Sequence, residues 1–360
     1  MNRLLQALAI CLIGAALASV ASAQTYEDMA LTKSAAKAQI TTATTATTIV
    51  FLGTGMPAPD PKRQGPSFVV EAGGNTYLFD MGVGLMRQAR AANVNISPPT
   101  AAFLSHLHTD HTLGLPDLMF TPWSAGGAPS SFPLYGPVGL QWMVNNIQSA
   151  YTQDICVRDV CQMLGKNNYL PPVVTEIKLS YPTGGPTPPP TGASAPTCTA
   201  CTQKCPAGKD CTCGAELPKS APQQVYADSA VKVSAFLVRH GCWDEALGYV
   251  IETLSDHKRI VYSGDTRYVA NMGAACNGCD VLIHELYWGK GEPACGSYMT
   301  CFHTTMNELE QVFKEGKPKK LVVVHQVGLP TPGKLVIPKC SSTETSGCVM
   351  FAKDLETIIP

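Results

Sequence analysis

The chain has 360 residues, which is long enough for one large α/β domain with insertions or for two smaller domains. Its 26 Lys and Arg residues are balanced by 27 Asp and Glu residues, so the formal net charge is -1. Proteins that bind nucleic acid usually carry a basic excess, and the composition therefore disfavours a polynucleotide partner.

The N-terminus is typical of a secretory signal peptide. A basic start at Arg3 precedes an almost wholly apolar run over residues 4–20, and residues 21–23 form a small-residue cleavage site. The apolar run is shorter than the about 20 residues that a membrane span needs, and no second run follows it. We therefore expect removal of residues 1–23, no integral membrane span, and a secreted or periplasmic protein.

The next segment, residues 24–47, is rich in Ala, Thr and Ser without apolar periodicity, which predicts a flexible arm before a domain over residues 48–360. Apolar runs predict strands at residues 49–52, 67–71, 76–79, 101–104, 231–238, 248–253, 259–262, 281–284 and 320–324. Apolar residues at helical spacing predict helices at residues 83–92 and 305–315, the second capped by Thr304 or Thr305. This alternation predicts an α/β fold.

The middle of the chain, residues 126–224, reads as a cysteine- and proline-rich insertion. It contains a Pro, Gly and Thr stretch that cannot build a core, followed by Cys198, Cys201, Cys205, Cys211 and Cys213. Cysteines in an exported chain favour disulfides over structural zinc. Spacing favours four local pairs, which are Cys156 with Cys161, Cys276 with Cys279, Cys295 with Cys301, and Cys340 with Cys348.

Four metal-capable side chains fall within six positions, directly after the strand expected at residues 101–104. They are His106, His108, Asp110 and His111. An extended backbone places His106 and His108 on one side, and a turn into a helix aims Asp110 and His111 at a second position. Nitrogen and oxygen ligands suit zinc, with iron and manganese as alternatives. The sequence therefore predicts a site for two divalent metal ions.

This H-x-H-x-D-H pattern after an apolar strand resembles the signature of the metallo-β-lactamase superfamily. Further motifs are similar to its ribonuclease Z and arylsulfatase-like branch, namely Phe51-Leu52-Gly53-Thr54-Gly55, Arg63-Gln64-Gly65-Pro66-Ser67, Leu78-Phe79-Asp80-Met81-Gly82 and Gly114-Leu115-Pro116-Asp117-Leu118. The resemblance covers residues 49–118 and 231–327. It implies an αββα sandwich of two mixed β-sheets flanked by helices.

The resemblance also implies three further ligands, which are His240 at a strand end, Asp265 as a carboxylate shared by both metals, and His325 after the last strand. One metal would be held by His106, His108, His240 and Asp265. The other would be held by Asp110, His111, Asp265 and His325. Asp80 would support the ligand histidines from behind.

Two metals holding a bridging hydroxide predict hydrolysis, with Asp110 as both ligand and orienting base. The resemblance implies His303 as general acid and Glu285 as its orienting partner. We therefore expect a metal-dependent hydrolase of small anionic esters, with phosphodiesters first and aryl sulfates second. Lactone or β-lactam hydrolysis is the alternative within enzymes. An exported binding protein that uses the cysteine-rich insertion is the alternative outside them.

The sequence also disfavours transfer RNA as a partner. The ribonuclease Z branch grips transfer RNA with an arm inserted between its third histidine and its bridging aspartate, whereas only a short hairpin separates His240 from Asp265 here. The sequence leaves open the substrate, the physiological metal and the oligomeric state, a homodimer included.

Overall fold

The computed structural model describes residues 46–126, 131–162, 169–179, 217, 221–241, 243–289, 298–328, 335–343 and 345–360. Contacts group the described residues into one compact unit. The predicted signal peptide, nearly all of the predicted arm and the cysteine cluster that follows the proline-rich stretch lie outside the described residues, so these assignments stay predictions. None of the described helices is long and apolar enough to cross a membrane.

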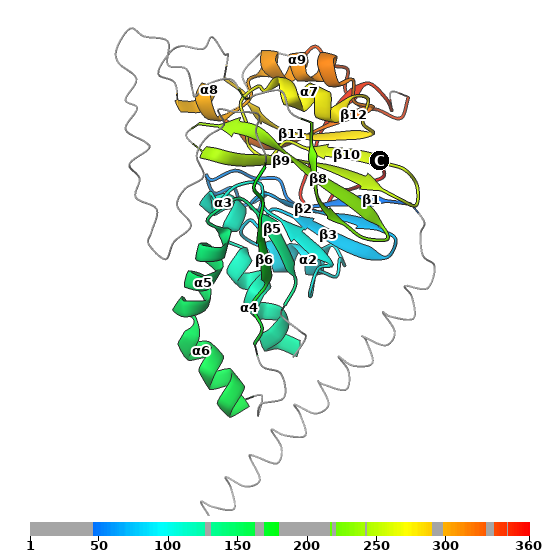
Figure 1. The fold of residues 1–360 in the computed structure, drawn as a ribbon. Coiled ribbons are helices and arrows are strands. Elements are labelled where there is room, and N and C mark those ends of the chain that lie inside the picture. The colour runs from blue at the N-terminus through cyan, green and yellow to red at the C-terminus, as the bar shows by residue number, and fades with distance from the viewer. Residues whose placement is uncertain are drawn as a thin grey trace, which may run out of the picture. The chain divides into compact units, whose positions relative to one another are not determined.

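Two seven-stranded sheets form the centre of the unit (Figure 1). The first has the order β14-β1-β2-β3-β4-β5-β6, and its strands are β1 (Thr48–Gly53), β2 (Ser67–Ala72), β3 (Asn75–Phe79), β4 (Ala101–Phe103), β5 (Pro133–Gly136), β6 (Val173–Glu176) and β14 (Thr357–Ile358). The second has the order β13-β12-β11-β10-β9-β8-β7, and its strands are β7 (Gln223–Ala227), β8 (Val231–His240), β9 (Trp243–Thr253), β10 (Arg259–Tyr262), β11 (Val281–Tyr287), β12 (Lys320–Val327) and β13 (Cys348–Phe351). Both sheets mix parallel and antiparallel pairs.

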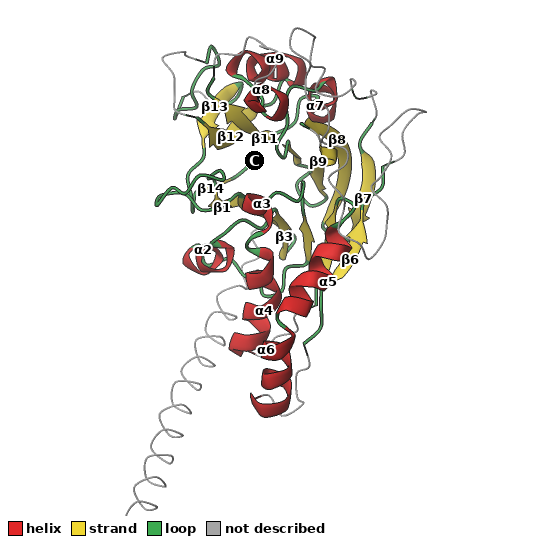
Figure 2. Ribbon diagram, turned by 90° about the vertical axis from the view of Figure 1, so that its left-hand side faces the viewer, coloured by secondary structure: helices red, strands yellow, loops and turns green. Residues whose placement is uncertain are grey.

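Helices cover the outer faces of both sheets (Figures 1 and 2). The helices of the described residues are α2 (Leu85–Ala91), α3 (Thr109–Thr112), α4 (Leu115–Gly126), α5 (Leu140–Ala150), α6 (Thr152–Val157), the π-helical turn η1 (Arg158–Gln162), α7 (Ala270–Cys276), α8 (Tyr298–Phe302) and α9 (Met306–Gly316). Apolar residues of α2, α4 and α5 pack on the first sheet, and those of α7 and α9 pack on the second. The expected αββα sandwich is thereby confirmed.

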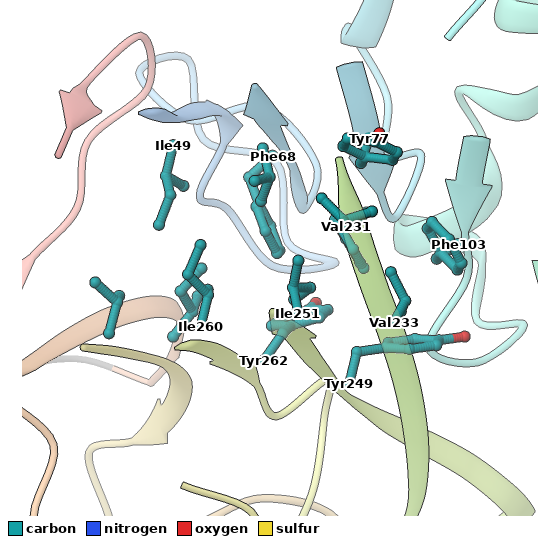
Figure 3. Close-up of a cluster of buried hydrophobic side chains, with 14 of the residues drawn as sticks. Ile49, Phe68, Tyr77, Phe103, Val231, Val233, Tyr249, Ile251, Ile260 and Tyr262 are labelled. Carbon is teal, nitrogen blue, oxygen red and sulfur yellow. The ribbon is translucent and has the colours of Figure 1, made fainter. Parts of the chain in front are cut away.

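The inner faces of the two sheets meet in a core of buried apolar side chains (Figure 3). Ile49 and Phe68 come from the first sheet, and Val231, Tyr249 and Ile260 come from the second. Side chains alternate between the faces of a strand, so each strand contributes every second residue to this layer. Burial of this layer fixes the strands of one sheet against those of the other, and therefore fixes where their ends lie.

Most expected strands and both expected helices form within a few residues of their predicted bounds. Thr305 caps α9 through a capping box with Glu308. Of the two caps that the sequence offered, Thr304 and Thr305, the second is therefore confirmed. The segment expected as an insertion is not irregular throughout, because β5 and β6 within it extend the first sheet beside β4. Residues 180–216 of that segment lie outside the described part of the chain.

Two of the four expected cysteine pairs are disulfides, Cys276 with Cys279 and Cys340 with Cys348. The expected pair of Cys156 and Cys161 is wrong, because both are exposed and free. Five helical positions separate their Cα atoms by about 7.5 Å along the helix axis, which is beyond the roughly 7 Å that a disulfide spans. Cys301 is disulfide-bonded, whereas Cys295, its expected partner, lies outside the described residues.

Candidate metal centre

The fold brings all seven predicted ligands together at the ends of strands from both sheets. His106 and His108 follow β4, and Asp110 and His111 lie in α3. The other three come from the second sheet, with His240 ending β8, Asp265 following β10 and His325 in β12. All are buried except His108, which is half-buried.

Three histidines form the first cluster. His106 Nε2 and His240 Nε2 each lie 3.0 Å from His108 Nδ1. The Nδ1 atom of His240 donates to the backbone oxygen of Phe302 at 2.7 Å, so its Nε2 carries a lone pair that points at the other two rings. Converging imidazole nitrogens of this kind form a face on which a cation binds.

Asp110, His111 and His325 form the second cluster. His325 Nε2 lies 3.1 Å from Asp110 Oδ2, and His111 Nε2 lies 3.4 Å from the same oxygen. Their ligand atoms all fall within 4.8 Å of one another. This set differs from the first in having a carboxylate oxygen between two imidazole nitrogens.

Asp265 lies between the two clusters. Its Oδ2 atom is 4.0 Å from His106 Nε2 and 3.9 Å from His240 Nε2 in the first cluster. The same oxygen is 3.4 Å from His111 Nε2 and 3.3 Å from His325 Nε2 in the second. One carboxylate therefore faces both clusters, which is the place that the sequence resemblance implied for it.

Asp80 anchors a histidine of each cluster. Its Oδ2 atom accepts a 2.7 Å hydrogen bond from His111 Nδ1. It also accepts one from the Ser105 hydroxyl at 2.8 Å, and that hydroxyl lies 3.0 Å from His106 Nδ1. Because the Ser105 hydroxyl donates its proton to Asp80, the Ser105 oxygen accepts a hydrogen bond from His106 Nδ1. The Nε2 atoms of His106 and His111 are therefore left to face the centre.

Close backbone packing places the loops around Asp110. The amide of Met81 donates to the His111 carbonyl at 2.8 Å, and the Gly114 amide donates to the Met81 carbonyl at 2.7 Å. A Cβ atom on Gly65 would lie 2.9 Å from the Asp110 carbonyl oxygen and 2.6 Å from a neighbouring amide nitrogen. A larger residue at Gly65 would therefore displace the loop that carries Asp110.

The predicted acid and its orienting partner also meet. His303 Nδ1 donates to Glu285 Oε1 at 2.9 Å, and the same oxygen accepts from the Thr266 amide at 2.8 Å. Thr304 donates to the Thr266 carbonyl, which ties the segment before α9 to the loop of Asp265. His303 reaches the centre as well, because a ligand atom of it lies within 4.8 Å of those of His240 and Asp265.

The electrostatic environment holds His106, His240 and Asp265 in their cation-binding forms. Burial lowers the pKa of His240 to about 3 and that of His106 well below the ordinary value. Burial alone would raise the pKa of Asp265, but His325 and His111 hold it well below its usual range. Neutral imidazoles beside an ionised carboxylate are the forms that coordinate divalent cations. For His111, burial lowers the pKa, but the carboxylates of Asp265, Asp80 and Asp110 outweigh it and raise the pKa well above its ordinary value.

Two buried atoms show that the donor set fits such a cation. His111 Nε2 and Asp265 Oδ1 are buried without a hydrogen-bond partner, although both groups are polar. Unpartnered buried polar atoms cost free energy unless an ion or water satisfies them. The His and Asp clusters are thus compatible with a dinuclear divalent metal site.

Sequence reasoning did not find two supports of this centre, Tyr262 and the Phe302 carbonyl. The Tyr262 hydroxyl donates to Asp80 Oδ2 at 2.6 Å, and the Phe302 carbonyl orients His240. Tyr262 immediately precedes the Ser-Gly-Asp turn of Asp265, so its position next to a ligand motif was the available signal. A backbone carbonyl leaves no signal in the sequence.

Sequence relatives are named ribonuclease Z. The chain is 41% identical over 112 residues to that of Mycolicibacterium gilvum, a match that covers 31% of this chain and 39% of the relative. It is 28% identical over 294 residues to that of Pyrococcus horikoshii, covering 77% of this chain and 85% of the relative. The chain thus matches less than half of the mycobacterial relative and most of the archaeal one.

The fold is similar to that of human tRNase Z, short form. The two structures share a TM-score of 0.58 and 23% sequence identity over 87% of this chain and 99% of the human chain. At this identity the similarity shows a common fold.

These relatives overturn two expectations. The expected substrate, a small anionic ester such as an aryl sulfate, is wrong, and so is the expectation that transfer RNA is disfavoured, because the relatives are ribonuclease Z enzymes. The second expectation rested partly on the net charge of -1, which averages over the whole surface. Bound cations are often the largest local charges in a site, so the average does not describe the centre.

Two family matches cover most of the described fold. Residues 60–214 match the family described as Metallo-beta-lactamase superfamily, and residues 198–326 match the Beta-lactamase superfamily domain. Together the matches include all seven predicted ligands, from His106 to His325. The chain therefore belongs to the metallo-β-lactamase superfamily of hydrolases, with relatives consistent with its ribonuclease Z branch.

Proposed function

We propose that this protein is a divalent-metal-dependent phosphodiesterase that cleaves RNA, with transfer RNA precursors as its substrate class. The observation that carries the proposal is Asp265 Oδ2, which lies within 4.0 Å of Nε2 atoms from both histidine clusters. The names of the sequence relatives supply the substrate class. We further propose zinc as the metal, because imidazole nitrogens dominate the donor set.

Charge at the centre supports a phosphodiester substrate. The two proposed carboxylate ligands, Asp110 and Asp265, carry two negative charges, and two divalent cations would carry four positive ones. The loaded centre would then have an excess of about two positive charges, which attracts a phosphate group. When bound, such cations supply Lewis acidity to the phosphoryl group and to the attacking water.

The protein's own residues complete the chemistry. Glu285 holds His303 through Nδ1, which leaves Nε2 as the nitrogen that faces the centre. As the P–O bond breaks, the leaving oxygen takes the proton from His303 Nε2. Asp110, held 3.1 Å from His325, orients the attacking water and accepts its proton.

The proposal is tested by incubating the zinc-loaded protein with a transfer RNA transcript that carries additional nucleotides at both ends. We expect site-specific cleavage, loss of cleavage in Asp265→Asn, and retained cleavage in the matched variant Asp256→Asn. Asp256 is a suitable control because it bonds Thr47 and Thr253 in a hairpin turn and touches no predicted ligand. Intact transcript in the presence of protein with both metal positions filled would refute the proposal.

A further inference from the structure

A carboxylate near the C-terminus ties two loops of the centre together. Asp354, between β13 and β14, accepts at Oδ1 from the Thr54 amide at 2.9 Å and from the Thr54 hydroxyl at 2.8 Å. Its Oδ2 accepts from the Gln64 amide at 2.6 Å and from the Gln88 side chain at 3.1 Å. Its four hydrogen bonds thus reach partners that lie 266 to 300 residues away in the sequence.

The Thr54 loop leads directly to His325. The Thr54 carbonyl accepts a 3.2 Å hydrogen bond from the His325 amide. His325 has a positive φ of 41°, at an irregularity in the pairing of β11 with β12. A left-handed conformation is unfavourable for a non-glycine residue and persists only where its surroundings fix it. The Thr54 carbonyl, held by Asp354, is one of those surroundings.

The Gln64 loop leads to Asp110. Gln64, whose amide Asp354 holds, precedes Gly65, and the Gly65 amide donates to the Val83 carbonyl at 3.1 Å. Gly65 packs so closely on Asp110 that an added Cβ would lie 2.9 Å from its carbonyl oxygen. The two loops that Asp354 holds therefore abut two ligands of the same cluster, and these ligands lie 3.1 Å apart.

The other cluster is held by different groups. His106 is oriented by Ser105, and His240 by the Phe302 carbonyl. We propose that Asp354 is a positioning residue for the metal position formed by Asp110, His111 and His325, and not for the position formed by His106, His108 and His240. The inference rests on the two-metal centre of the proposed function and is independent of its substrate.

Zinc titration of the full-length apoprotein against a chromogenic chelator tests this inference. We expect wild-type protein to bind two equivalents. Asp354→Asn, which keeps the shape but cannot accept from both amides, should retain one tight equivalent and bind the other 10- to 100-fold more weakly. Its profile should follow that of His325→Ala and not that of His240→Ala.

Asp228→Asn is the matched control, because Asp228 also accepts four hydrogen bonds but contacts no predicted ligand. It should bind both equivalents as the wild type does. Two wild-type affinities in Asp354→Asn, or an equal weakening of both, would overturn the inference. If that variant does not fold, Thr54→Val, which removes only the hydroxyl donor, gives the same comparison. Since the titration measures binding alone, failure to cleave RNA counts against the proposed function only.

Discussion

The hydroxyl of Tyr262 donates a 2.6 Å hydrogen bond to Asp80 Oδ2. Tyr262 ends β10 in the second sheet, whereas Asp80 follows β3 in the first, so the bond joins the two sheets beneath the centre. The same oxygen orients His111 directly and His106 through Ser105. The Asp80 carboxylate therefore both links the two sheets and orients two of the predicted ligands.

Replacing Tyr262 by Phe tests this link. The variant keeps the ring in the core but leaves Asp80 with one donor fewer, so we expect a loss of about 2 kcal/mol in the free energy of unfolding and up to tenfold weaker zinc binding. Urea unfolding of the apoprotein and zinc competition measure the two effects. Tyr249→Phe is the control, because its hydroxyl donates to the Leu104 carbonyl, and it should lower stability alone. Unchanged zinc affinity in Tyr262→Phe would argue against the link.

Removing the shared carboxylate should affect both metal positions. Asp265→Ala deletes the oxygen that faces four histidines in two clusters. We expect both zinc equivalents to weaken by more than the roughly 10- to 100-fold typical of losing an outer support. Elemental analysis after dialysis measures the remaining zinc. One equivalent retained at wild-type affinity would show that Asp265 serves a single position.

Local patterns in the sequence predicted much of the fold and the centre, since strand runs, the capping of α9 and the ligand motif all depend on neighbouring residues. Contacts between distant segments left no such pattern. The Tyr262–Asp80 bond spans 182 residues, and the Asp354–Thr54 bonds span 300. The predicted disulfide between Cys156 and Cys161 is wrong for a related reason. The spacing of the two cysteines does not reveal that they lie in consecutive helical turns that keep them apart.

Because Glu285 contacts His303, we expect replacement of Glu285 to shift the pH profile of RNA cleavage. Burial lowers the pKa of His303, but the Glu285 carboxylate outweighs it and raises the pKa to about 9. Only the protonated imidazole donates, so activity should fall as the pH rises through this value. Glu285→Gln removes the carboxylate and should move the basic limb of the kcat/KM profile to lower pH.

Glu308→Gln is the control for this shift. Glu308 caps α9 close to His303 in the sequence, and glutamine preserves a capping box. This variant should keep the wild-type profile. A basic limb that stays in place in Glu285→Gln would contradict the role of Glu285 as the partner that sets the His303 pKa.

Free thiols on α6 and η1 predict selective labelling. Cys156 and Cys161 are exposed and unpaired, so both should react with a maleimide in the folded protein. Cys276 and Cys279, which share a buried disulfide, should stay unlabelled until the protein is unfolded and reduced. Peptide mass spectrometry distinguishes the two outcomes. A Cys156–Cys161 disulfide in the non-reduced digest would contradict the structure.

Asp228 predicts a stability difference that depends on pH. It accepts hydrogen bonds from the hydroxyls of Tyr77 and Tyr226 and from the amides of Ala230 and Val231. Burial raises its pKa, but these donors, Tyr77 first, lower it below the ordinary value. A folded pKa below the unfolded value stabilises the protein above the unfolded value of about 3.9, and this contribution is lost as the pH falls through the folded pKa.

We therefore expect Asp228→Asn to lower the free energy of unfolding by about 1 kcal/mol near neutral pH, a modest value because the carboxylate is partly solvated. The difference from the wild type should shrink as the pH falls below about 4, because Asp228 is then protonated first in the unfolded state and, at still lower pH, in the folded protein. Urea unfolding of both proteins across this range measures the effect. A difference that stays constant into acid would show that the four donors stabilise the turn through its shape and not through the charge of Asp228.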